Sequence, residues 1–223
     1  MKPRTLSLVA FIRQYGQPYS ELLGIDLRSG RNEEIVKWFL AAVLYSKPIR
    51  ETSATRTYTC FADTGTVTAE AIRRTGWDGL VSLLDAGGYT RYDFSTADKL
   101  LEVFGNLEKN YQSNLNLLHR KAKDPRDLED RLKALGKGIG ETTVAIFLRD
   151  MRFAWSKADP KPTPLVQMAM KKLKVRNLKT LATSEGLDIV SLETALLRLA
   201  KDFIKKSRSV RVSLDRGKEF LRF

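Results

Sequence analysis

The fold is decided by residues Leu128–Arg152, which read LEDRLKALGKGIGETTVAIFLRDMR. Leucines spaced by four and then three residues mark one helix, and the glycine cluster Gly136-Lys137-Gly138-Ile139-Gly140 follows it. A second helix is predicted from Glu141 to about Arg152, because its apolar residues recur on one side. Two helices joined by so short a turn must pack against each other.

The glycine cluster also predicts a place for an anion. Gly138 and Gly140 suit positions where φ is positive or where another backbone comes close, and Ile139 between them is expected to plug the turn into the core. The main-chain amides of Gly138, Gly140 and Glu141 would then lie at the start of the second helix, where they can donate to a phosphate with the help of the helix dipole. The alternative is that the glycines only make a tight turn.

Charge favours the phosphate interpretation. Lys133, Lys137 and Arg149 fit a phosphate-facing edge of this element. The whole chain of 223 residues carries a net charge of +13, which a polyanionic partner would explain. A basic protein whose charge only keeps it in solution is the alternative.

The composition also argues against several classes of protein. One cysteine, Cys60, and one histidine, His119, exclude a four-thiolate iron–sulfur cluster or a histidine metal cluster built from this chain alone. The longest apolar run, Trp38–Tyr45, is too short to cross a bilayer and is typical of a buried helix. We expect an intracellular protein, cytoplasmic or associated with the nucleoid or nucleus, without a membrane or small-molecule cofactor.

The rest of the chain has helical periodicity almost throughout, which predicts an all-α protein. Asn32 is expected to cap Glu33–Tyr45, and Thr68 to cap Ala69–Thr75. A separate helix is expected over Trp77–Asp85, and Asp124-Pro125 is expected to end the helix predicted over Asn106–Lys121. Near the end, Val210, Val212 and Leu214 alternate like a strand, but that stretch is too short to decide.

Leu135–Ala145, LGKGIGETTVA, resembles the hairpin and following helix of the helix-hairpin-helix DNA glycosylases, the superfamily of endonuclease III and adenine glycosylase. Phe39–Ser46 resembles the family's apolar helix that ends near DNA, and Leu80–Tyr92, with Gly88-Tyr89-x-Arg91, resembles its Gly-x-Tyr-x-x-basic segment. Thr163–Leu173 has the apolar pattern of the helix that normally opens with the catalytic aspartate, so the match spans roughly Asn32–Val175.

The resemblance implies a two-lobed helix-hairpin-helix DNA glycosylase fold. Residues 32–152 would form a six-helix lobe that includes the hairpin, and residues 1–31 together with 153–223 would form the second lobe. Duplex DNA would lie across the cleft between the lobes, with one nucleotide flipped into it.

The sequence departs from the family at the catalytic positions. The lysine of bifunctional members corresponds to Thr142, so Schiff-base lyase chemistry is not expected there. The catalytic aspartate aligns with Thr163, a good helix start but a poor catalyst. Asp159, four residues earlier, is the candidate catalytic carboxylate, with capping of a turn before proline as the alternative. Asp150 is expected to be a surface charge.

Two further contacts are expected. Lys47 follows the Phe39–Ser46 helix, where family members often fill the gap left by a flipped base. Tyr89 is the aromatic candidate for stacking on that base, so that Tyr89, Thr142 and Thr163 are the expected base pocket.

The sequence therefore predicts a DNA-binding base-excision-repair protein, an N-glycosylase that is monofunctional if active, acting on a damaged or mismatched base in double-stranded DNA. We expect a monomer without a metal site, apart from a monovalent cation that the hairpin carbonyls could hold. A catalytically inactive DNA-binding protein on the same fold and a basic helical RNA-binding protein remain alternatives.

Overall fold

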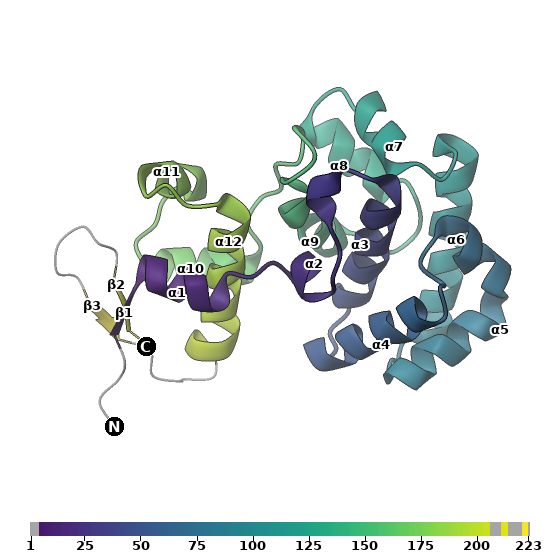
Figure 1. The fold of residues 1–223 in the computed structure, drawn as a ribbon, viewed down its shortest axis with the longest axis horizontal. Coiled ribbons are helices and arrows are strands. Elements are labelled where there is room, and N and C mark those ends of the chain that lie inside the picture. The colour runs from purple at the N-terminus through teal and green to yellow at the C-terminus, as the bar shows by residue number, and fades with distance from the viewer. Residues whose placement is uncertain (1–4, 206–210, 214–219, 223) are drawn as a thin grey trace. The chain divides into compact units, whose positions relative to one another are not determined.

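The computed structural model describes residues 5–205, 211–213 and 220–222 (Figure 1). This part of the chain is mostly helical, as the sequence predicts. It divides into two compact units, one made of residues 1–22 and 161–223, the other of residues 23–160. Within the described ranges, no helix is both long enough and apolar enough to cross a membrane.

The unit of residues 23–160 contains the glycine turn. Its elements, in chain order, are η1 (Leu27–Ser29), α3 (Asn32–Tyr45), α4 (Glu51–Asp63), α5 (Ala69–Gly87), α6 (Asp93–Tyr111), α7 (Leu115–Lys121), α8 (Pro125–Lys133) and α9 (Glu141–Met151).

Helix α3 lies at the centre of this unit, because its residues from Trp38 to Leu44 are all buried and it packs against α4, α7 and α9. Trp38 and Phe39 are fully buried. The Trp38 indole donates a hydrogen bond to the Phe147 carbonyl of α9 (3.0 Å), and the Phe39 and Phe147 rings meet with centroids 5.0 Å apart. These contacts hold α9, and with it the glycine turn, against the core.

Local side-chain caps begin several of these helices. The Thr68 hydroxyl accepts from the Ala71 amide, and the Asp124 carboxylate accepts from the Asp127 amide. Asn32 behaves differently from the prediction, because it lies inside α3 and its side-chain oxygen accepts from the Leu115 amide of α7 instead. It ties α3 to α7 and leaves the start of α3 without a side-chain cap.

The two helices expected over 69–85 form one element, α5, with a break inside it. Gly76 has a φ of 69° and a ψ of 177°, a conformation that glycine adopts without strain. The predicted interruption at Gly76 is therefore present, but it is a kink within one helix rather than a gap between two, and the kinked helix packs along α6.

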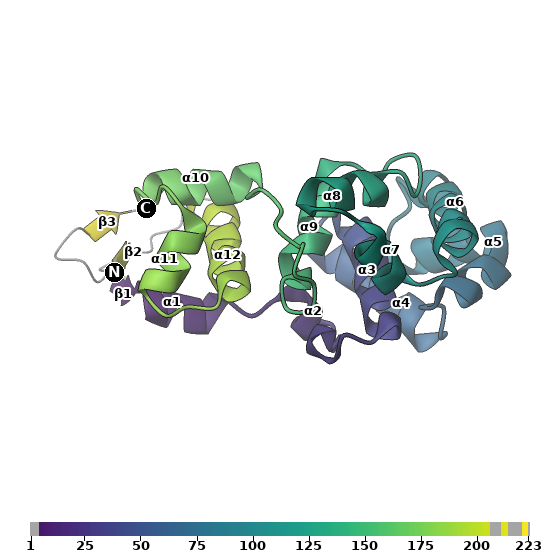
Figure 2. The same cartoon turned by 90° about the horizontal axis from the view of Figure 1, so that it is seen from above.

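The other unit has its own core. Figure 2 shows α10, α11 and α12 gathered with α1, and apolar residues such as Phe11, Val166, Leu192 and Leu196 fill the space between them. Its elements, in chain order, are β1 (Thr5–Ser7), α1 (Leu8–Tyr15), α2 (Tyr19–Leu22), α10 (Pro164–Lys172), α11 (Leu178–Ser184), α12 (Ile189–Arg198), the π-helical turn η2 (Leu199–Ile204), β2 (Arg211–Ser213) and β3 (Phe220–Arg222).

A small sheet in this unit goes beyond the all-α prediction. β1 pairs in parallel with β2, with Leu6 opposite Val212, and β2 pairs antiparallel with β3. Val212 is buried in the core of the unit. Of the alternating residues noted in the sequence, Val210 and Leu214 lie outside the described residues.

The boundary between units differs from the expected limits of 32 and 152. Residues 23–31 belong with the central helices, because the Asn116 side chain donates to the Gly30 carbonyl (2.9 Å). Residues 153–160 belong there too, because Arg152 donates to the Pro160 carbonyl and Lys157 to the His119 carbonyl. Helical periodicity predicts the helices but not these hydrogen bonds.

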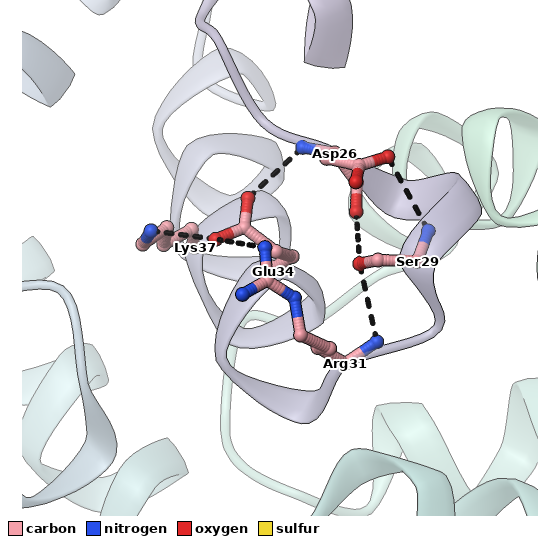
Figure 3. Close-up of polar contacts among 5 residues, drawn as sticks. All are labelled: Asp26, Ser29, Arg31, Glu34 and Lys37. Atoms are coloured by element: carbon pink, nitrogen blue, oxygen red, sulfur yellow. Dashed lines mark hydrogen bonds and ion pairs between the residues drawn. The ribbon is translucent and has the colours of Figure 1, made fainter.

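The Glu34 carboxylate anchors the first of these segments to α3 (Figure 3). It accepts hydrogen bonds from the Asp26 amide (2.9 Å) and the Lys37 ammonium (2.7 Å). Burial alone would raise the pKa of Glu34, but these two hydrogen bonds, with the charges of Lys37 and Arg31, lower it below its ordinary value. The ion stays charged and holds the loop on the helix.

Candidate nucleic-acid interface

Helices α8 and α9 are joined by the glycine turn Gly136–Gly140, which has the conformation that the sequence requires. Gly138 has a φ of 87°, in the left-handed region, and a Cβ at Gly136 would lie 2.7 Å from a Val103 methyl carbon of α6. Ile139 is 4% exposed, so it enters the core from the middle of the turn. The turn is thus held from beneath by α6.

The main-chain amides of the turn differ in whether they have a hydrogen-bond acceptor within the protein. Gly140 is the N-cap residue of α9 and provides no side chain for capping. Within the described residues, the N–H groups of Gly138, Gly140 and Glu141 have no hydrogen-bond acceptor. The neighbouring Lys137 N–H is different, because it donates to a Glu102 carboxylate oxygen (3.1 Å). Three free donors at a helix start, with the helix dipole behind them, are suited to an anion.

A buried lysine lies under this turn. Lys99 of α6 is only 6% exposed, and a Cβ added to Gly138 would lie 2.7 Å from its Cε and 3.1 Å from its Nζ. Burial, followed by the charge and hydrogen bonding of the neighbouring Lys47, lowers the pKa of Lys99 to about 8. Among residues 5–205, no carboxylate forms an ion pair with Lys99.

Sequence reasoning missed Lys99, although a signal was present. Lys99 lies three residues after Thr96 and four before Val103, and both of these are buried. Helical spacing therefore places a lysine on the apolar face of α6. A charge at such a position is unusual and marks a residue to examine.

The predicted cations fall into different environments. Lys137 is exposed on the turn. Lys47, just beyond α3, is half-buried, with its ammonium 5.4 Å from the centre of the Tyr92 ring. Lys133 forms ion pairs with Glu141 and Glu129, so carboxylates already surround it. The structure therefore places Lys137 on the turn itself and Lys47 next to Lys99, whereas Lys133 is paired with Glu129 and Glu141.

Two expected roles are wrong. Arg149 is only 3% exposed and its Nε donates to Asp150 (2.7 Å), which is itself fully buried. Both residues lie on the side of α9 that faces inward, so Arg149 cannot line an exposed phosphate edge and Asp150 is no surface charge. The pair instead satisfies two charges inside the protein.

Tyr89 is also not available for stacking on a base. Its side chain is 1% exposed, and its hydroxyl donates to the Leu44 carbonyl at the end of α3 (2.7 Å). Tyr92, the N-cap residue of α6, is the more exposed aromatic residue of this segment, and the charged groups of Lys47 and Arg91 lie near its ring.

The residues at the expected catalytic positions lie in two units. Thr142 is exposed in the first turn of α9. Asp159 is half-buried between Ala158 and Pro160, in the loop that follows α9. Thr163 belongs to the other unit, where it is the N-cap residue of α10 without making a side-chain cap. A base pocket made by Thr142 and Thr163 together stays a prediction.

No group of three or more histidine, cysteine, aspartate or glutamate side chains able to hold a metal ion is found in the part of the chain that the structure describes. A monovalent cation at the carbonyls of the turn stays a prediction. Comparison with protein-family models, with curated proteins and with solved structures found no match to this chain.

Proposed function

We propose that this protein binds double-stranded DNA by gripping a backbone phosphate with the turn Gly136–Gly140, and that it acts in base-excision repair as an N-glycosylase. The observation that supports this most is the set of acceptor-free amides at Gly138, Gly140 and Glu141. Lys99, Lys47 and the exposed Lys137 supply positive charge near these amides, while Glu102 bonds to the Lys137 amide and Glu141 pairs with Lys133. A chain with a net charge of +13 would add long-range attraction to DNA.

In the proposed reaction, a damaged or mismatched base leaves the stack and its glycosidic bond is hydrolysed. Asp159 is the proposed carboxylate that stabilises the cationic sugar and activates water. Thr142 offers a hydroxyl where an amine would be needed for a Schiff base, so the proposed enzyme is monofunctional.

A second candidate is a DNA-binding protein without catalysis. The exposed hydroxyl of Thr142 and the position of Thr163 as an N-cap residue favour it, because neither supplies the amine or carboxylate of an active site. Both candidates share the same grip on phosphate and differ only in chemistry.

Binding is tested by fluorescence anisotropy with a labelled duplex over a range of salt concentrations. Lys137→Glu is expected to lower affinity for all sequences and to reduce the slope of log affinity against log salt by about one. Lys109→Glu is the matched control, because Lys109 is an exposed residue of α6 about 15 Å along the helix from Lys99. Equal losses in the two variants, or a clear preference for structured RNA at matched salt, would contradict the proposal.

Catalysis is tested with duplexes that contain uracil, 8-oxoguanine or alkylated bases, by measuring base release. Asp159→Asn is expected to abolish any release while leaving duplex affinity unchanged. Release that persists in this variant would discard the assignment of Asp159. Tight binding without release from any duplex would favour the non-catalytic candidate.

A further inference from the structure

Burial of the charged Lys99 side chain destabilises the free protein. A buried ammonium group loses the stabilisation of water, and only an anion or good acceptors can replace it. Lys99 is 6% exposed, and the group that most affects its charge is another cation, Lys47. Below about pH 8 two positive charges therefore lie side by side.

The carboxylates near the turn interact with groups other than Lys99. Glu102, also on α6, accepts from the Lys137 amide, and Glu141 pairs with Lys133. Neither forms an ion pair with Lys99 in the described part of the chain. Lys99 therefore lies beside Lys47 and against Gly138, whose main-chain N–H has no acceptor within the described residues.

We propose that Lys99 and the amides of the turn form one phosphate site, in which the Lys99 ammonium binds a non-bridging oxygen of a DNA phosphodiester from below while the amides donate from the rim. This inference rests on the proposed function and assigns the charge that completes its phosphate site. Lys47 lies beside the same site and contributes its charge to it.

The chemistry of the donors suits a phosphodiester. The donors are separate N–H groups and an ammonium, which together can serve several lone pairs on the two non-bridging oxygens of one phosphate. An arriving phosphate supplies the missing negative charge, so the burial of Lys99 becomes favourable only in the complex. Phosphate contacts of this kind fix register on the duplex without reading sequence.

Lys99→Met tests the site by separating stability from binding. Methionine keeps an unbranched apolar chain, and removing an uncompensated buried charge is expected to leave the melting temperature unchanged or raise it. Duplex affinity is expected to fall about tenfold, with a salt slope reduced by about one, as for loss of one charge-assisted contact. Lys109→Met, which removes one charge at an exposed position of α6, is the matched control and should change the affinity and the salt slope much less.

Three outcomes are distinct. Loss of affinity with retained or increased stability supports the site. If Lys99→Met binds like wild type while Lys137→Glu does not, the inference is wrong and the proposed function stands. If the wild-type protein does not bind duplex DNA at all, the proposed function fails, and the inference fails with it.

A measurement on the unmodified protein covers the case in which Lys99→Met does not fold. NMR titration of lysine ε-CH₂ groups should show one lysine with a pKa near 8 in the free protein, which rises when a 12-base-pair duplex is added, about one helical turn of DNA. An unchanged pKa for this lysine in the complex would overturn the inference.

Discussion

Lys99 and Gly138 are in direct contact across two elements, since a Cβ on Gly138 would approach the Cε of Lys99 to 2.7 Å. The same glycine has a φ of 87°, which side-chain-bearing residues rarely adopt. The turn is therefore restricted twice at one position, by its own backbone and by the lysine beneath it. This contact links the shape of the turn to the charge of the proposed phosphate site.

Gly138→Ala is expected to destabilise the protein by about 1 to 3 kcal/mol, because alanine at this φ is strained and its Cβ must displace Lys99. Duplex affinity should fall as well, since the amides of the turn would move. Urea denaturation measures the stability, and fluorescence anisotropy measures the duplex affinity.

Gly105→Ala in α6 is the control, because its Cβ would meet nothing within 4 Å. A helical Gly→Ala change is expected to be stabilising by up to about 1 kcal/mol. Equal effects of the two substitutions would contradict this account of the turn.

Much of the fold could be predicted because its signals are local. Asp124-Pro125 predicts a boundary, and the structure places Asp124 as the side-chain cap and Pro125 in the first turn of α8. Glu141–Met151 likewise begins where the glycines end. Capping and backbone freedom depend mostly on a few neighbouring residues, so the sequence predicts many of them. Asn32 is the exception, because a distant helix, α7, binds the side chain predicted to cap α3.

The environment of individual side chains could not be predicted in the same way. Arg149 has a side chain of the type that contacts phosphate, but it is buried with Asp150. Tyr89 has an aromatic ring of the kind that stacks on a base, but its hydroxyl donates to a carbonyl at the end of α3. Both outcomes depend on how distant helices pack, which helical periodicity within one segment does not determine.

The stability of the free protein is predicted to rise between about pH 8 and pH 10.5 because of Lys99. Its pKa is lowered to about 8 in the folded protein, whereas the unfolded chain has the ordinary value of 10.5. In this interval the unfolded chain holds a proton that the folded protein has released, so raising the pH favours folding, by about 1.4 kcal/mol per unit of pKa difference. Denaturation in urea from pH 7 to 10 measures it, and Lys99→Met should lack this rise. Parallel profiles would show that burial of the ammonium has no energetic cost.

Tyr89→Phe is expected to lower stability by about 1 to 3 kcal/mol without weakening DNA binding. The Leu44 carbonyl lies in the last turn of α3, where carbonyls lack partners within the helix, and the Tyr89 hydroxyl provides one (2.7 Å). Phenylalanine would leave that carbonyl buried and unsatisfied. Tyr92→Phe is the control, because the Tyr92 hydroxyl makes no hydrogen bond within the described residues. A loss of affinity in folded Tyr89→Phe protein would restore a role for this residue at the interface.

His119 is predicted to make the protein less stable in mild acid. Burial, then the charges of Lys157 and Arg120, lower the pKa of His119 below the ordinary value of 6.5. As the pH falls through 6.5, the unfolded chain takes up a proton before the folded protein does, so the contribution of His119 to stability is present above that pH and declines below it.

The His119 ring stacks on Trp155 with centroids 4.8 Å apart and planes 4° apart, and His119→Phe keeps that aromatic contact while removing the titration. Thermal unfolding between pH 5 and 7.5 should show a steeper loss in wild type than in the variant. His119 is the only histidine in the chain, so no other imidazole can produce that difference. Two parallel curves would mean that the His119 environment does not disfavour its charged form.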